Sequence, residues 1–118
     1  MEATGLPGRR VKLRQTGAEQ RSYRHRMTEI LVTPLGFDLY RVEVRESESN
    51  SVHDVTVAPR DLIAFAPGHG THELLEESFR FLLEREPKEA ILPRFELAAI
   101  ARYFPDYPIE IKRRIAGR

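Results

Sequence analysis

The chain has 118 residues, of which 41% are hydrophobic and 31% are charged, and this composition is typical of one small globular domain. It contains no cysteine, which excludes disulfides, thiolate metal ligands and cysteine nucleophiles. No apolar run approaches the roughly 20 residues of a membrane-spanning helix, and the first residues do not resemble a secretory signal. We therefore expect a cytoplasmic protein that has no membrane partner.

The basic residues are concentrated at the two ends of the chain. Residues 1–26 carry seven Arg and Lys against two Glu, and residues 94–118 carry six basic residues against three acidic ones. Because residues 1–26 have few apolar positions and no regular periodicity, they are expected to form a flexible basic extension. A second interpretation is that Met27 is the natural start and that the preceding residues have no function. The domain itself is predicted to span residues 27–118.

Three segments have the composition and alternation of short β-strands. They are residues 30–32, 37–46 and 52–57. In the second segment Tyr40, Val42 and Val44 share one face, and in the third Val55 and Val57 do so. A polar loop separates these two segments, which are expected to pair as a hairpin. The pattern predicts a small antiparallel β-meander of about three strands.

The rest of the chain is predicted to form three to five short helices, most of which end at prolines. These helices cover residues 59–66, 71–86, 88–92, 96–104 and 108–115. Thr71 is the expected N-cap of the longest helix, in which Leu75, Phe79 and Leu82 recur at helical spacing. The predicted fold class is α+β, with the helical layer covering one face of the sheet.

Apolar residues of the helical region are spaced to line one interior. They are Phe79, Leu82, Leu83, Ile91, Leu92 and Phe95. Burial of each would contribute roughly 1.5–3 kcal/mol, so packing explains them without a ligand. The segment 103–108 has two interpretations. Tyr103 and Tyr107 could present an aromatic surface to a partner. Alternatively, Phe104 and Tyr107 could close the core, with the tyrosine hydroxyls reaching the surface.

The histidines are the only candidates for a metal site. His69 and His72 lie three residues apart, and His53 could complete a ligand shell with nearby carboxylates. The alternative is that all three are ordinary loop histidines, because the sequence has no second spaced pair of ligands. No serine lies in a G-x-S-x-G motif, and Gly68 and Gly70 lack the continuation of a phosphate-binding loop. No catalytic residue, cofactor or metal is therefore predicted.

The segments "VHDVTVAPRDL" and "HELLEESFRFLLERE" resemble the ribbon-helix-helix family of small DNA-binding repressors and antitoxins, over residues 52–86. The resemblance implies a strand that pairs across a dimer, with Asp54 and Thr56 facing the bases. The stretch from Ser78 to Tyr107 is also similar to small uncharacterised bacterial proteins with strands followed by helices. That similarity implies a bacterial cytosolic protein without an assigned activity.

The sequence favours a non-enzymatic binding or regulatory module with an unknown protein partner. The alternative is a nucleic-acid- or ribosome-associated protein that uses its basic ends to contact phosphates. The candidate contacts are Arg9, Arg10, Lys12, Arg14, Lys112, Arg113 and Arg114. Ribbon-helix-helix-like DNA binding ranks below both, and a metal-dependent enzyme around the histidines is a further hypothesis. An exposed sheet edge would also permit a homodimer.

Overall fold

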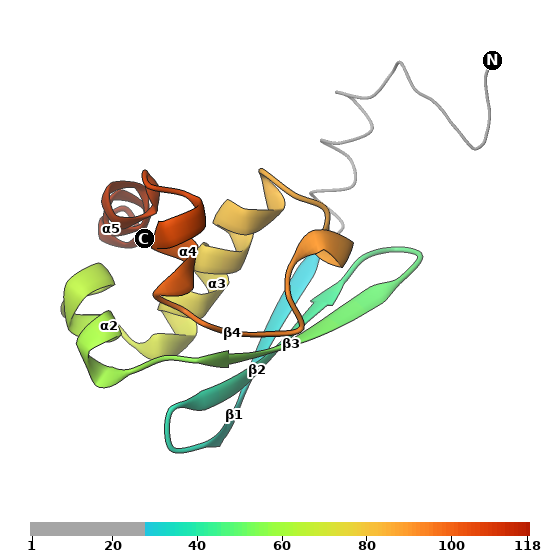
Figure 1. Cartoon of the computed structure of the whole chain (residues 1–118), viewed down its shortest axis with the longest axis horizontal. Coiled ribbons are helices and arrows are strands. Elements are labelled where there is room, and N and C mark those ends of the chain that lie inside the picture. Colours follow the sequence, from blue (N-terminus) through green and yellow to red (C-terminus); the bar gives the residue numbers. More distant parts are fainter. Residues whose placement is uncertain (1–27) are drawn as a thin grey trace. The chain divides into compact units, whose positions relative to one another are not determined.

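The four strands form one mixed sheet in the order β1-β2-β3-β4 (Figure 1). The computed structural model describes residues 28–118, so the predicted basic extension lies outside the described residues. Residues 29–45 and 50–118 form one compact unit. The strands are β1 (Glu29–Gly36), β2 (Leu39–Arg45), β3 (Asn50–Thr56) and β4 (Arg94–Glu96).

The antiparallel meander is confirmed, and a fourth strand extends it. β1 pairs with β2 and β2 pairs with β3, both antiparallel. β4 then pairs parallel to β3, with Phe95 beside Val55. The sequence had assigned residues 94–96 to no strand, because a single apolar residue between two charged ones is too short a pattern to identify one.

The β1–β2 hairpin turns at a position that requires glycine. Gly36 has φ of 131°, which side chains rarely permit, and Phe37 follows with φ of 50°. The register of the two strands shifts between Pro34 and Gly36, where the pairing changes into the turn. The Phe37 side chain points into solvent and is fully exposed.

Five helical segments follow β3 or flank β4, and Figure 1 shows them gathered on one side of the sheet. They are α2 (Pro59–Phe65), α3 (Thr71–Leu83), the 3₁₀ turn η1 (Lys88–Ala90), α4 (Ala99–Tyr103) and α5 (Tyr107–Ala116). The fold class is therefore α+β, as predicted. None of the helices in the described part of the chain has the length and apolar character needed to cross a bilayer.

The core lies between the inner face of the sheet and α3, and it continues between α3 and α5. Val42, Val44 and Val55 project from the sheet and are fully buried, as their alternation predicted. Phe79 of α3 packs on His53 of β3, with ring centroids 5.4 Å apart, and Ile111 of α5 belongs to the same core. The opposite sheet face carries charged residues, and there Arg41 Nε donates to Asp54 Oδ1 at 2.9 Å. This hydrogen bond is the main cause of the lowered pKa of Asp54.

The start of α3 corrects one prediction. Gly70, not Thr71, is the N-cap, and Thr71 is the first helical residue. The side chain of Glu73 reaches back, and its Oε1 accepts a hydrogen bond from the Gly70 amide at 2.9 Å. This bond satisfies one of the free amide groups at the N-terminus of the helix, and it is the main cause of the lowered pKa of Glu73.

Candidate functional site: an apolar pocket beside helix α4

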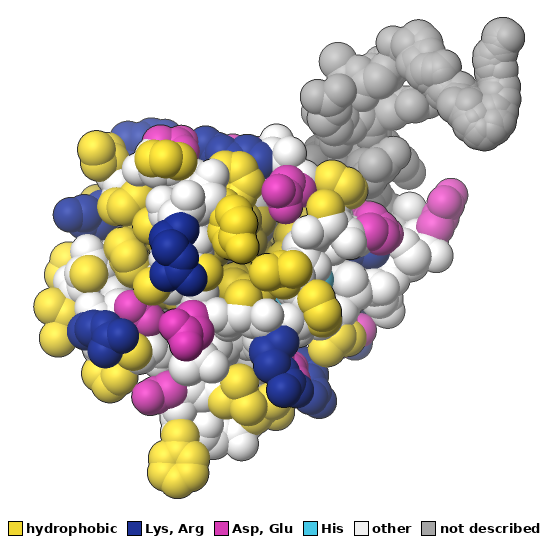
Figure 2. All heavy atoms as spheres, viewed as in Figure 1, with side chains coloured by type: hydrophobic (Ala, Val, Ile, Leu, Met, Phe, Trp, Pro, Cys, Tyr) yellow, Lys and Arg dark blue, Asp and Glu magenta, His cyan; other side chains and the backbone are white. Residues whose placement is uncertain are grey.

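A pocket of about 190 Å³ opens where the end of α3, η1, β4 and α4 meet. Figure 2 shows hydrophobic side chains gathered around a hollow over these elements. Every lining residue except Glu86 has an aliphatic or aromatic side chain. The lining consists of Leu82, Glu86, Ala90, Ile91, Leu92, Phe95, Ala99, Ile100, Tyr103 and Phe104.

Prolines separate the short elements that surround the pocket. α3 ends at Leu83, and Pro87 then begins the single turn of η1. The carbonyl of Pro93 accepts a hydrogen bond from the Asp54 amide at 2.8 Å, which holds the chain beside β3 before β4 begins. α4 stops at Tyr103, and Phe104 is extended, as expected for a residue that precedes proline. Because these elements are short, they do not cover the apolar side chains between them completely, and the pocket remains open there.

A buried histidine supports one wall of the pocket. His53 is 2% exposed, and its Nδ1 lies 2.8 Å from the carbonyl oxygen of Leu92. Because a carbonyl can only accept, Nδ1 carries the proton, and Nε2 of the neutral ring accepts from the Ser51 hydroxyl at 2.7 Å. Burial lowers the pKa of His53, although the Leu92 hydrogen bond and the Asp54 charge partly oppose this effect. The neutral ring therefore fixes the backbone at the pocket rim.

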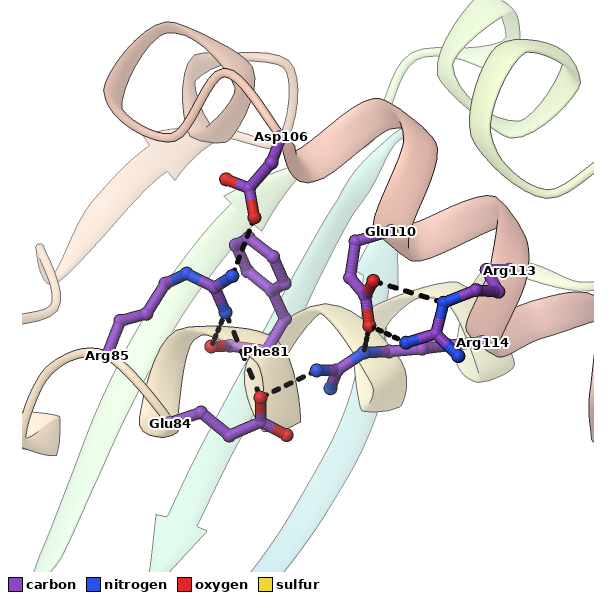
Figure 3. A network of polar contacts seen from close by, with 7 residues as sticks. All are labelled: Phe81, Glu84, Arg85, Asp106, Glu110, Arg113 and Arg114. Carbon is purple, nitrogen blue, oxygen red and sulfur yellow. Dashed lines mark hydrogen bonds and ion pairs between the residues drawn. The ribbon is translucent and has the colours of Figure 1, made fainter.

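An ion-pair network lies next to the pocket at Phe104, and Figure 3 shows its members. The guanidinium of Arg85 lies 3.7 Å from the centroid of the Phe81 ring, and its Nη2 contacts Asp106 Oδ2 at 2.7 Å. The same guanidinium is 5.9 Å from the ring of Phe104, which lines the pocket. Contacts of Arg85 therefore link the end of α3 to the turn between α4 and α5.

The two tyrosine candidates have different environments. Tyr103 is 68% exposed at the pocket, where a partner could contact it. Tyr107 is fully buried, and its hydroxyl lies 2.7 Å from Ser78 Oγ. Burial raises the pKa of Tyr107 above its usual value. The interpretation that Tyr107 closes the core is confirmed, whereas the expectation that its hydroxyl reaches the surface was wrong. Buried in this way, Tyr107 presents no exposed surface to a partner.

The structure also corrects one member of the predicted interior. Phe79, Leu82 and Ile91 are buried, as expected. Leu92, by contrast, is 49% exposed on the pocket rim. It directly follows the buried Ile91 in an extended connection, so the two side chains point in opposite directions.

The histidine candidates are not brought together. His53 lies on the inner face of β3, whereas His69 just before α3 and His72 in its first turn each contact a glutamate of that helix. His69 Nδ1 is 3.4 Å from Glu73 Oε1, and His72 Nε2 is 3.2 Å from Glu76 Oε2. Within residues 28–118, no group of three or more His, Cys, Asp or Glu side chains is placed to hold a metal ion.

Two of the three C-terminal residues predicted to contact phosphate are paired with glutamate side chains (Figure 3). Arg114 is 18% exposed in its side chain and contacts Glu84 Oε1 at 2.6 Å and Glu110 Oε2 at 2.8 Å. Arg113 also pairs with Glu110. Lys112 is exposed on α5. The other candidates, Arg9, Arg10, Lys12 and Arg14, lie outside the described residues.

The comparison with known proteins gives no relative on which to base a function. The chain matches no family model, no curated protein and no solved structure. The ribbon-helix-helix resemblance implies that β3 pairs across a dimer. In this fold β3 already has β2 on one side and β4 on the other. Asp54, the implied base-reading residue, is engaged by Arg41.

The sequence predicted neither the pocket nor the position of Glu86 in its wall. The pocket depends on how the end of α3 packs with the three short elements that follow it, and no periodicity records that arrangement. One signal was present in the sequence. Leu92 is the last residue of the predicted turn over 88–92 and directly precedes Pro93, a context that favours an extended residue.

Proposed function

We propose that this protein is a non-enzymatic binding module, and that its apolar pocket receives one large side chain of a partner polypeptide. The observation that carries the proposal is the exposure of Leu92 and Tyr103 on the rim of a pocket of about 190 Å³. Exposed apolar surface around a concave site is typical of interaction sites. Aromatic rings in such positions frequently contribute most of the binding energy.

The size of the pocket favours a side chain over a cofactor. Pockets for drug-sized ligands usually measure about 300–1,000 Å³, whereas this one measures about 190 Å³. A cavity of about 150 Å³ accepts benzene. One Phe, Leu or Met side chain is therefore the occupant that matches the volume. The pairing of Arg113 and Arg114 with carboxylates is a further reason to prefer a protein partner over nucleic acid.

The proposal can be tested by selecting a phage-displayed random peptide library on the immobilised full chain. Binding of the selected peptides is then measured by fluorescence anisotropy. The variants Leu92→Ser and Tyr103→Ser should bind them about tenfold more weakly or worse, as for central interface residues. Ile63→Ser and Ile109→Ser are matched controls, because these residues are 74% and 76% exposed but lie outside the pocket.

Three results would contradict the proposal. The first is a library that enriches no peptide, and the second is a set of enriched peptides that bind all four variants with the affinity of the parent chain. The third is concentration-dependent self-association in sedimentation velocity that Tyr103→Ser abolishes. That result would identify a second copy of the chain as the occupant. Circular dichroism and urea unfolding of each variant verify that the fold is retained.

A further inference from the structure

The wall of the pocket contains one charged side chain, Glu86. It lies three residues beyond the last residue of α3, and its amide donates to the carbonyl of Leu82 at 2.9 Å. Its side chain is half-buried among the apolar residues of the lining. The C-terminus of a helix carries a partial negative charge, so both the carboxylate and the helix end favour a cation here.

Glu86 differs from its charged neighbours, which are already paired. Glu84 contacts Nη2 of Arg114 at 2.6 Å, and Arg85 contacts Asp106 at 2.7 Å. Among the described residues, no hydrogen bond or ion pair engages the carboxylate of Glu86. In the free protein this carboxylate is hydrated at the pocket rim.

A partner that fills the pocket would remove part of this hydration. A carboxylate that loses water without gaining a donor is strongly unfavourable, whereas a charge-assisted hydrogen bond restores the interaction. We infer that the partner segment carries Lys or Arg beside a Phe, Leu or Met anchor, an inference that rests on the proposed binding function. Segments with Asp or Glu at that place are rejected, since they bring two carboxylates together.

The test uses a peptide library with one fixed Phe between randomised positions, selected on the full chain at low salt. Lys and Arg beside the Phe should be enriched over Asp and Glu by about three- to tenfold, the range expected for a partly screened ion pair. Glu86→Gln should remove this bias and Glu86→Lys should reverse it. Glu96→Gln is the matched control, because Glu96 is exposed on β4 and does not line the pocket.

The outcomes separate this inference from the proposed function. If Phe peptides are enriched and depend on Tyr103 but show no charge bias, the cation requirement is overturned and the pocket remains a binding site. The same conclusion follows if the bias persists in Glu86→Gln. If a library with fixed Phe is enriched no more than one with fixed Gly, the binding function itself is refuted, and the inference with it.

Discussion

The buried hydrogen bond between Ser78 and Tyr107 joins the middle of α3 to the first turn of α5. Both side chains are fully buried, and the two oxygens are 2.7 Å apart. In Ser78→Ala the phenol loses this partner inside the core, and an unsatisfied buried polar group costs about 1–3 kcal/mol of unfolding free energy. In Tyr107→Phe the remaining serine hydroxyl can turn to a carbonyl of its own helix, so that change should cost less.

The double variant Ser78→Ala/Tyr107→Phe removes both polar groups together. Its loss should be smaller than the sum of the two single losses by about 1 kcal/mol, the net value of a typical hydrogen bond. Urea unfolding followed by circular dichroism measures all four proteins, with unchanged slopes and shifted midpoints expected. Because burial raises the pKa of Tyr107, the phenol stays protonated, and the same result is expected at pH 7 and pH 9.

This reasoning would be refuted if the double variant lost as much unfolding free energy as the two single variants together, since independent sites add to within about 0.5 kcal/mol. So would a Ser78→Ala variant as stable as the parent, because it would show that the phenol needs no partner in the core. Ser47→Ala is a matched control, since Ser47 is exposed between β2 and β3.

Three further changes probe the sheet, the buried histidine and the ion-pair network. Since burial lowers the pKa of His53 below its usual value of about 6.5, the unfolded chain binds the proton more readily, and stability should fall as the pH drops below about 6.5. A His53→Asn variant should have a smaller slope of stability against pH over that range; an unchanged slope would contradict this origin. Arg114→Lys keeps the charge but loses the paired geometry to two carboxylates, so its urea midpoint should fall, and the difference should shrink in high salt. Gly36→Ala places a side chain at φ of 131° and should cost about 1–3 kcal/mol, whereas Gly117→Ala, with φ of −89°, should not show this strain; equal losses would refute the conformational argument.

The strands were predictable because the sheet has one buried and one open face. Val42 and Val44 alternate with Arg41 and Glu43, and the structure buries the valines and places the charged residues on the outer face. β4 could not be predicted from such an alternation, because the strand is too short to show one. It has three residues, and it exists because Phe95 packs on Phe79, with ring centroids 6.1 Å apart, while the backbone pairs with β3.

The error at Tyr107 could have been avoided from the sequence. Tyr107 precedes Ile111 and Ile115 at four-residue spacing, and all three are buried on one face of α5. The predicted helix began at Pro108, which left Tyr107 in the connection before it. Pro108 does occupy the first turn of the helix, where proline is tolerated, but α5 begins one residue earlier, at Tyr107.

Residues close together in the sequence belong partly to the core and partly to the rim of the pocket. Ile91 and Ile100 are almost completely buried and form the inner wall of the pocket, whereas Leu92 and Tyr103 stand on its rim. Truncating an inner residue leaves a cavity and destabilises the fold. In such a variant, a loss of binding caused by unfolding cannot be told from one caused by a lost contact. Rim residues can be changed with little effect on stability, because about half or more of their surface is already exposed. A binding function for this pocket must therefore be tested at Leu92, Tyr103 and Glu86.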